Sequence, residues 1–519
     1  MEALVSKDRK SLESHRSFAK IYHQTVFGRK KDMSNKKYKI NIARMAVRLL
    51  ILVCLIAIGI HIVPQIFKKP CEHVFAEDGF CTICGEECVH EYVDGVCSIR
   101  KKPCEHEYGE DRICTICGMV KPDEILNLSV IAGGDVMAHL ANIESAFNWD
   151  GSFEQGYAGY QTVYSDGSFD FTDNYTYVKP YIQDADLALV NVETTFSTGG
   201  PIYSGYWGSF SAPDALAAAL SDAGFDVAFT CNNHSLDYGG IAGLQRTVQV
   251  LRDNGLTVVG SRKSTDENRS SVIEVNGIKV GLVAYTYETG TEYDWRQLNG
   301  APMEDGAWNY LNGYRWSAST YLACDEDKQA IGEQIRWCKD NGAEIVIAYF
   351  HWDTFNEYVF EVTSLQSDLA RFAAEQGADI VLGSHPHRVQ RMEVLSVTDA
   401  DGKERQVPVY YSLGNYISNQ RYETMDWTPA DDPYASEQEI MAYLEVEYNR
   451  TKDIVNFTKI SAIPMYVDKF WGDNLEYRIY PLVGDYTSGT ELGISGNAWR
   501  ADQALSTLTG ILGEQYIYR

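Results

Sequence analysis

Two kinds of apolar pattern alternate along most of this chain. After residue 126, short apolar runs bounded by turn residues are followed by longer segments with helical character. Short apolar runs of this kind are typical of buried strands, and their regular alternation with helical segments is typical of α/β domains. The pattern therefore predicts one large α/β domain over most of the chain, at 126–420, with an extension at 421–519 that completes it.

The predicted strands are apolar runs that end in polar loops. They cover 128–132, 186–190, 226–230, 256–260, 271–274, 279–286, 343–350, 378–382 and 409–411, with an antiparallel pair at 440–448 and 454–463. The predicted helices cover 212–223, 241–254, 325–340, 365–376 and 502–512. Between them, 287–321 is aromatic and acidic with weak periodicity. A loop of this length is typical of a lid or binding loop, and an ordinary surface excursion is the alternative.

A different pattern marks the first part of the chain. Leu49–Phe67 is an apolar run interrupted only by His61, Pro64 and Gln65. About 20 apolar residues cross a bilayer, and the long basic arm at 1–48 is unlike the short head of a cleavable signal peptide. We expect 49–67 to be an uncleaved transmembrane anchor, with a buried core helix as the alternative. The basic arm predicts a cytoplasmic N-terminus and a single-pass cell-membrane protein whose C-terminal domain is extracellular.

Charge supports this division. The formal net charge is −27, and residues 1–48 carry 13 Lys and Arg against 4 Asp and Glu, so the remainder carries −36. Such an acidic body argues against nucleic acid as a partner, because it offers no basic surface for phosphates. It also disfavours a polyanionic substrate, unless a metal ion and nearby arginines at 388, 391 and 421 compensate locally.

Cysteines and histidines recur together between residues 70 and 120. Two repeats offer three cysteines and one histidine each, which is a complete tetrahedral set for structural zinc. These sets are Cys71, His73, Cys81 and Cys84, and Cys104, His106, Cys114 and Cys117. A middle repeat has Arg100 where the last cysteine would stand. Zinc-knuckle-like repeats are one interpretation; disulfides, favoured by an extracellular location, are the other.

Polar residues with metal-binding chemistry follow five of the predicted strands. They are Asp135, Glu193, Asn233 with His234, His351, and finally His385 with His387 in the segment Gly383-Ser-His-Pro-His387. Ligands bind outside the carboxyl ends of strands in open α/β sheets. One such residue would be unremarkable, but five strand ends in order predict a shared metal site.

Together these residues resemble the poly-gamma-glutamate capsule synthesis (CapA-type) family, a branch of the calcineurin-like metallophosphoesterase fold. The matching pieces are Gly134-Asp135, Asn191-Val-Glu193, Asn232-Asn-His234 with Asp237 and Gly239, His351-Trp352, Gly383–His387 with Gln390, and Ser412-Leu-Gly-Asn415. The resemblance implies a β-sandwich flanked by helices with a metal site at the sheet edge. In this chain that domain would be preceded by the transmembrane helix and the Cys/His-rich segment.

By the same resemblance, one or two divalent ions would be bound. Asp135 and His387 would hold one metal, Asn233, His351 and His385 the other, and Glu193 would bridge them. His234 would be the catalytic residue that donates a proton or steadies an oxyanion. Mixed nitrogen and oxygen ligands suit Mn, Fe or Zn. One departure is Met137, which stands where the family's fold typically carries a histidine, so the first metal position is short of a ligand.

The leading hypothesis is therefore a membrane-anchored capsule or surface-polymer biosynthesis protein with a metal-dependent hydrolase or transfer site. Its expected partners are the membrane, an anionic polymer or phosphoester substrate, and other membrane proteins of capsule synthesis. The alternative is a non-catalytic cell-surface scaffold that keeps a vestigial or structural metal site.

Overall fold

The computed structural model of the protein describes residues 92–93, 96–97, 105–117, 119–156, 162–206, 208–352, 357–398, 402–425 and 431–519. The chain divides into two compact units, 1–122 and 123–519. The predicted basic arm, the predicted anchor at 49–67 and the zinc-ligand candidates Cys71, His73, Cys81, Cys84 and Cys104 lie outside the described residues. Within those residues, no helix combines the length and apolar character needed to cross a bilayer.

Little of the first unit is described. Strands β1 (Tyr92–Val93) and β2 (Val96–Cys97) form an antiparallel pair. Farther along, isolated antiparallel bridges join Tyr108 to Cys114 and Ile113 to Val120. These bridges fold the last Cys/His repeat back on itself.

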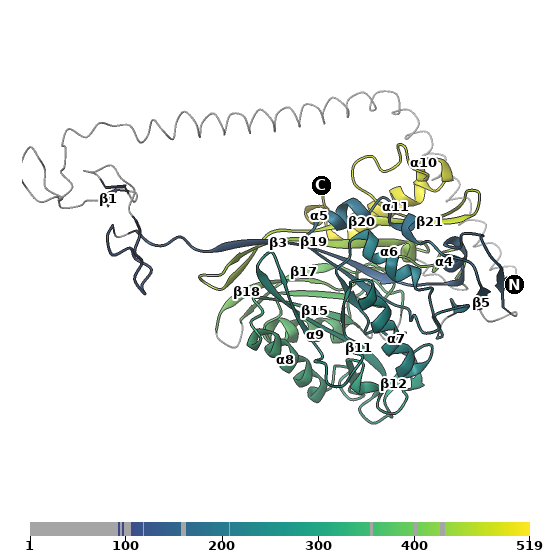
Figure 1. Cartoon of the computed structure of the whole chain (residues 1–519), viewed down its shortest axis with the longest axis horizontal. Coiled ribbons are helices and arrows are strands. Elements are labelled where there is room, and N and C mark those ends of the chain that lie inside the picture. The colour runs from purple at the N-terminus through teal and green to yellow at the C-terminus, as the bar shows by residue number, and fades with distance from the viewer. Residues whose placement is uncertain are drawn as a thin grey trace, which may run out of the picture. The chain divides into compact units, whose positions relative to one another are not determined.

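The second unit is built on two seven-stranded sheets (Figure 1). The first has the order β21-β20-β19-β3-β6-β8-β9: β3 (Ile125–Val136), β6 (Leu187–Val192), β8 (Val227–Phe229), β9 (Thr257–Val259), β19 (Gln438–Asn449), β20 (Ile454–Trp471) and β21 (Leu475–Pro481). The second has the order β10-β11-β15-β16-β18-β17, with β14 beside β11: β10 (Ser271–Val275), β11 (Ile278–Thr291), β14 (Gly313–Trp316), β15 (Ile345–His351), β16 (Ile380–Ser384), β17 (Met392–Thr398) and β18 (Glu404–Tyr410).

The centre of each sheet is parallel. In the first sheet β3, β6, β8 and β9 run parallel, with Val130 opposite Leu187. In the second, β11, β15, β16 and β18 run parallel, with Leu282 opposite Ile347. Parallel neighbours bring their carboxyl ends to the same edge, so residues that follow these strands gather there.

The two sheets share a hydrophobic core, and alternation along the strands explains how the second sheet is buried on both faces. Leu282 and Leu382 belong to the same buried cluster as residues of the first sheet, and the rings of Phe229 and Tyr349 stack with centroids 4.3 Å apart. The neighbouring residue Val283 belongs instead to a second buried cluster, which includes residues of α8 and α9. Side chains alternate between faces along a strand, so a strand covered on both sides is apolar throughout.

The helices complete the layers. They are α4 (Leu140–Ser145), α5 (Lys179–Asp184), α6 (Ala215–Ala223), α7 (Gly240–Asp253), α8 (Asp325–Asp340), α9 (Ser364–Glu375), α10 (Leu492–Ser495) and α11 (Ala498–Leu512). Helix α9 begins with a capping box in which Thr363 and Gln366 satisfy each other's backbone N–H groups. Two smaller sheets are formed by β4 (Phe153–Gln155), β5 (Thr162–Ser165) and β7 (Ile202–Ser204), and by β12 (Gln297–Leu298) and β13 (Ala301–Pro302).

The last hundred residues contribute three strands, β19, β20 and β21, to the first sheet. Strand β19 lies between β20 and β3 and pairs with β3 over eight residues, from Ala442 opposite Ala132 to Asn449 opposite Ile125. The antiparallel pair expected at 440–448 and 454–463 is present and longer. Strands β14, β17 and β21 were not expected, because their apolar positions are interspersed with polar ones.

Candidate metal centre

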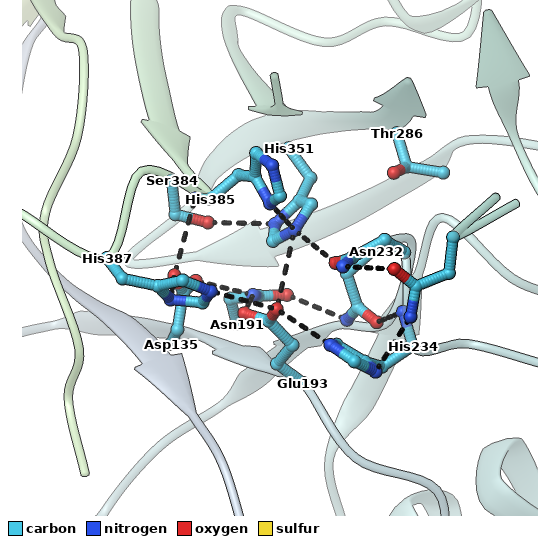
Figure 2. A network of polar contacts seen from close by, with 12 residues as sticks. Asp135, Asn191, Glu193, Asn232, His234, Thr286, His351, Ser384, His385 and His387 are labelled. Atoms are coloured by element: carbon cyan, nitrogen blue, oxygen red, sulfur yellow. Dashed lines mark hydrogen bonds and ion pairs between the residues drawn. The ribbon is translucent and has the colours of Figure 1, made fainter. Parts of the chain in front are cut away.

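Six of the seven candidate side chains meet at one place in Figure 2, and the seventh, Asn233, contacts His351. Asp135 lies near the end of β3, Glu193 follows β6, and Asn233 and His234 come after β8. His351 ends β15, whereas His385 and His387 follow β16. The sequence pattern predicted a site at the edge of a single sheet. In the structure, β3, β6 and β8 belong to the first sheet, whereas β15 and β16 belong to the second. The site therefore lies where the carboxyl ends of two sheets meet.

Glu193 is at the centre of the cluster. Its Oε1 atom is 3.6 Å from His351 Nε2 and 3.9 Å from the Nε2 atoms of both His234 and His387. The same oxygen is buried and has no hydrogen-bond partner among the described residues. An unpaired buried carboxylate oxygen facing three imidazole nitrogens is the arrangement expected when a cation normally satisfies it.

The remaining ligands converge on His351. Its Nε2 atom is 2.8 Å from Asn233 Oδ1 and 3.1 Å from His385 Nδ1. On the other side, His387 Nδ1 is 3.5 Å from Asp135 Oδ2. All of these side chains are almost completely buried.

These residues fit a divalent cation. Two sets of three residues could hold a metal ion, and within each set the ligand atoms lie within 4.8 Å of one another. One set is Glu193, His385 and His387, and the other is Asp135, Glu193 and His351. Glu193 belongs to both sets, as a bridging residue would. These sets differ from the two groups of ligands that the family resemblance implies. The assignment of residues to one or two ions stays a prediction.

The electrostatics of the cluster favour a cation. Burial, and then the charge of Asp135, raise the pKa of Glu193 well above its ordinary value. Burial, and then His385, lower the pKa of His351 well below its ordinary value, and burial followed by His387 does the same to His385. Two of the imidazoles are therefore held neutral, which is the form that ligates metals, and a bound cation would favour the ionised form of Glu193.

Asp135 and His387 behave differently from the other ligands. Burial acts to raise the pKa of Asp135, but its hydrogen bond with His387 and the charge of that ring outweigh burial and lower the pKa. Burial acts to lower the pKa of His387, but the hydrogen bond with Asp135 and the charges of Glu357 and Asp135 outweigh burial and raise the pKa. Asp135 and His387 therefore each favour the charged form of the other.

Amide side chains that were not assigned a role from the sequence hold the carboxylates in place. Asn191 Nδ2 donates to Asp135 Oδ1 at 2.7 Å and lies 3.4 Å from Glu193 Oε2. Asn232 Nδ2 donates to Asn191 Oδ1 at 3.2 Å. Asn415 Oδ1 lies 2.8 Å from His387 Nδ1, so that Nε2 of this ring faces Glu193. Partners of this kind fix the orientation of metal ligands.

His234 is oriented by a carboxylate three residues further on. Its Nδ1 atom is 2.7 Å from Asp237 Oδ2, and Phe210 N donates to the same oxygen at 3.0 Å. With Nδ1–H donated to Asp237, the Nε2 atom is directed toward Glu193. This is the arrangement of an imidazole that exchanges protons with a reacting group.

The backbone around the cluster is unusually tight. A Cβ atom on Gly134 would lie 2.0 Å from the carbonyl oxygen of Gly414, and Asp135 N donates to that oxygen at 3.0 Å. His385 and His387 have φ angles of +98° and +55°, which side chains other than glycine rarely adopt. Strain of this kind is found at sites where the surrounding structure enforces a functional geometry.

Met137 supplies no ligand in either set, although it is buried beside Asp135. His139 belongs to neither set of ligand atoms, and its Nδ1 accepts a hydrogen bond from Asn419 N at 3.1 Å. Burial, and then the charges of His387 and His234, lower the pKa of His139 to about 3.

A pocket opens beside the cluster and shares Asn233 with it. Its volume is about 410 Å³, and the hairpin β12–β13 from the aromatic segment forms one wall. Asn299, at the tip of this hairpin, accepts a hydrogen bond from Asn233 Nδ2 at 3.3 Å. Part of the 287–321 segment therefore reaches the site, which sequence periodicity did not show.

The first unit holds a second group of possible ligands. The ligand atoms of His106, Cys114 and Cys117 lie within 4.8 Å of one another, and Cys117 Sγ is 3.3 Å from His106 Nδ1. Burial acts to raise the pKa of Cys114, but backbone N–H groups and His106 outweigh it and lower the pKa to about 6. Thiolates of lowered pKa are good zinc ligands.

Comparison with known proteins gives one family over the domain. Residues 129–420 match the model of the bacterial capsule synthesis protein PGA_cap. The chain is 26% identical over 215 residues to the PGA biosynthesis protein CapA of Bacillus subtilis, covering 41% of this chain and 46% of that protein. It is 26% identical over 228 residues to the capsule biosynthesis protein CapA of Bacillus anthracis, covering 43% and 46%. The matches thus span less than half the length of these relatives.

Among solved structures, a phosphatase from Mycoplasma pneumoniae has a TM-score of 0.33 at 14% identity, covering 66% of this chain and 95% of that one. The sulfate thiohydrolase SoxB of Thermus thermophilus has a TM-score of 0.30 at 11% identity, covering 74% and 60%. No functional conclusion follows from likenesses this weak.

Proposed function

Because the chain belongs to the bacterial capsule synthesis protein PGA_cap family, we propose that it is a metal-dependent hydrolase or transferase acting on a phosphoester or amide bond of a cell-surface polymer. The observation that supports this most is Glu193 Oε1, a buried oxygen with no described partner that faces three imidazole nitrogens. A non-catalytic scaffold would have no need to hold such a costly cluster in strained backbone.

In this proposal the ligands are Asp135, Glu193, Asn233, His351, His385 and His387. A divalent cation, Mn, Fe or Zn, would supply positive charge that acidifies water and polarises a phosphoryl or acyl oxygen. His234 then gives a proton from Nε2 to the leaving oxygen or nitrogen. Asp237 holds the ring in the required orientation through Nδ1 and stabilises the protonated imidazole.

The experiment is metal analysis of the purified protein, joined to a screen of phosphoester and gamma-glutamyl substrates with and without Mn²⁺. We expect stoichiometric divalent metal and metal-stimulated turnover in the parent protein, and neither in His385→Ala. A folded protein that binds no divalent metal would refute the enzyme proposal. Capsule formation restored in cells by the His385→Ala protein would favour the scaffold instead.

We further propose that residues 49–67 anchor the protein in the cell membrane, with 1–48 in the cytoplasm and the catalytic unit outside the cell, near the membrane partners of capsule synthesis. The apolar run and the basic arm before it support this. The test is protease accessibility of intact cells: the body should be cleaved from outside while an epitope at the N-terminus is protected.

The Cys/His repeats are proposed to hold structural zinc. The convergence of His106, Cys114 and Cys117 supports this, since three of the four ligands expected from the last repeat lie together. Zinc content of a 70–122 fragment, before and after chelation, tests it. A fragment whose fold is unchanged without metal, or which has oxidised to disulfides, would refute zinc.

A further inference from the structure

The pocket beside the metal centre is lined by residues from three parts of the chain. They are Tyr206 with Gly208, residues between 233 and 240, and residues between 298 and 304. Its volume of about 410 Å³ lies within the range of small-molecule sites. Because Asn233 and Asp237 also belong to the catalytic cluster, whatever fills the pocket lies next to the reacting atoms.

The charged residues that line this pocket are all acidic. Two carboxylates, Asp237 and Glu304, contribute to its lining, and no described lining residue is Lys or Arg. Both carboxylates are held in place: Asp237 Oδ2 accepts from Phe210 N, and Glu304 Oε2 accepts from Ile241 N at 2.8 Å. Asp237 is already paired with His234, whereas Glu304 has no ion-pair partner among the described residues, so a second anion beside Glu304 would be repelled.

The rest of the pocket lining is suited to an uncharged chemical group of a ligand. The apolar part of the lining consists of Leu298 and Pro302 in the hairpin, Met303 just after it, and Leu236 in the segment that follows β8. Asn299 adds an amide that can accept or donate a hydrogen bond. A ligand group with apolar surface and a few N–H or O–H donors matches these walls.

We propose that this pocket binds the uncharged or cationic part of the substrate, an amine-bearing or hydroxyl-bearing group, while the phosphoryl or acyl group that reacts lies at the metal centre. This inference rests on the proposed function and narrows its substrate class. It excludes from the pocket a repeating unit with a free carboxylate, such as a residue within a polyglutamate chain. The substrate is then a phosphoester or amide that carries a neutral or cationic group on the pocket side.

Binding measurements test the pocket independently of turnover. Three phosphomonoesters share the phosphate and differ in the group beyond it: phosphorylcholine is cationic there, methyl phosphate is neutral, and 2-carboxyethyl phosphate is anionic. Calorimetry on the full-length protein with Mn²⁺ gives their Kd values. We expect 2-carboxyethyl phosphate to bind at least about tenfold more weakly than phosphorylcholine, because like charges placed together oppose binding.

Glu304→Gln is the matching variant, since its amide oxygen can still accept from Ile241 N while the charge is removed. We expect it to reduce the preference for phosphorylcholine over 2-carboxyethyl phosphate several-fold. Glu274→Gln, an exposed carboxyl in β10 that does not line the pocket, is the control and should leave the preference unchanged.

Equal or tighter binding of 2-carboxyethyl phosphate by the parent protein would overturn the inference, as would equal effects of the two variants. Hydrolysis of p-nitrophenyl esters, followed in parallel, reports on the proposed function alone. Selective binding without hydrolysis would support the pocket assignment and refute the enzyme; hydrolysis without selectivity would do the reverse.

Discussion

Individual side chains in this site have separable tasks. The ligands must be present for a metal to bind, whereas His234 belongs to neither set of possible ligands and its Nε2 atom lies 3.9 Å from Glu193 Oε1. Removing His234 should therefore affect turnover more than metal content.

We expect His234→Ala to lower metal-stimulated kcat by about 10²–10⁴-fold, the usual contribution of a general acid. Metal content by atomic emission should stay within a factor of two of the parent protein. A variant that keeps nearly full activity would show that another group supplies the proton. Asp237→Asn, which keeps a hydrogen-bonding partner for Nδ1, should lose less.

Asn299 is expected to act through Asn233. Its Oδ1 accepts from Asn233 Nδ2, which directs Asn233 Oδ1 toward His351 Nε2. Removing such a partner typically weakens metal binding about 10–100-fold. We expect that loss in Asn299→Ala, measured as the Kd for Mn²⁺, with the exposed Asn309→Ala as the control. Unchanged Mn²⁺ affinity would restrict Asn299 to the pocket wall.

Glu439, in β19, predicts a pH-dependent stability. It is fully buried, neither carboxylate oxygen has a hydrogen-bond partner among the described residues, and burial followed by the charge of Asp135 raises its pKa well above 4.5. The unfolded chain ionises this group at lower pH than the folded chain does. Stability from this residue is therefore fully present below about pH 4.5 and is lost as the pH rises toward the folded-state pKa.

We accordingly expect Glu439→Gln to melt at the parent temperature near pH 4, and about 2–4 °C higher near pH 8, by circular dichroism. Glu447→Gln, on the same strand and partly exposed, is the control. A Glu439→Gln gain that is the same at both pH values would contradict a protonated, buried Glu439.

At the scale of elements, the site depends on how closely β3 approaches the loop after β18. Gly134 leaves room for the Gly414 carbonyl, which accepts from Asp135 N, and Met137 N donates to Ile417 O just beyond. This contact fixes the end of β3 and, with it, the Asp135 carboxylate.

Gly134→Ala should therefore cost more than about 2 kcal/mol of stability, because its Cβ would meet backbone that cannot rotate away. Denaturant unfolding measures this. Gly510→Ala in α11, where the added Cβ meets nothing within 4 Å, should instead stabilise by about 0.5–1 kcal/mol. Tolerance of Gly134→Ala would mean that β3 and the loop can separate without loss.

For the whole molecule, every described ligand and supporting amide of the metal centre lies in the unit 123–519. Strand β19, which pairs with β3 beside the site, belongs to the same unit. We expect a 123–519 fragment to unfold cooperatively, and Mn²⁺ at a hundred times its Kd to stabilise it by about 2.7 kcal/mol. An aggregated or metal-indifferent fragment would show that the first unit is required.

Much of this arrangement follows from local sequence. Apolar runs place β6, β8, β15 and β16 within a few residues of their observed ends, because strands buried on both faces carry little else. The six candidate ligands and His234 also stand out, since residues with such chemistry that directly follow apolar runs are recognisable without any contact information. The strands β14, β17 and β21 were missed, because strands with mixed apolar and polar residues resemble loops in sequence.

The sequence by itself picked out the candidate site residues and predicted that they follow strands. Only the tertiary structure decided that these strands belong to two sheets, that Glu193 lies between the ligands, and that Asn299 and the β12–β13 hairpin form a pocket beside them. The physical reason is that the periodicity of apolar residues reflects which face of a single helix or strand is buried, and this is a local property of the sequence. Pairing between β19 and β3, some three hundred residues apart, and the approach of one sheet edge to another arise from long-range packing.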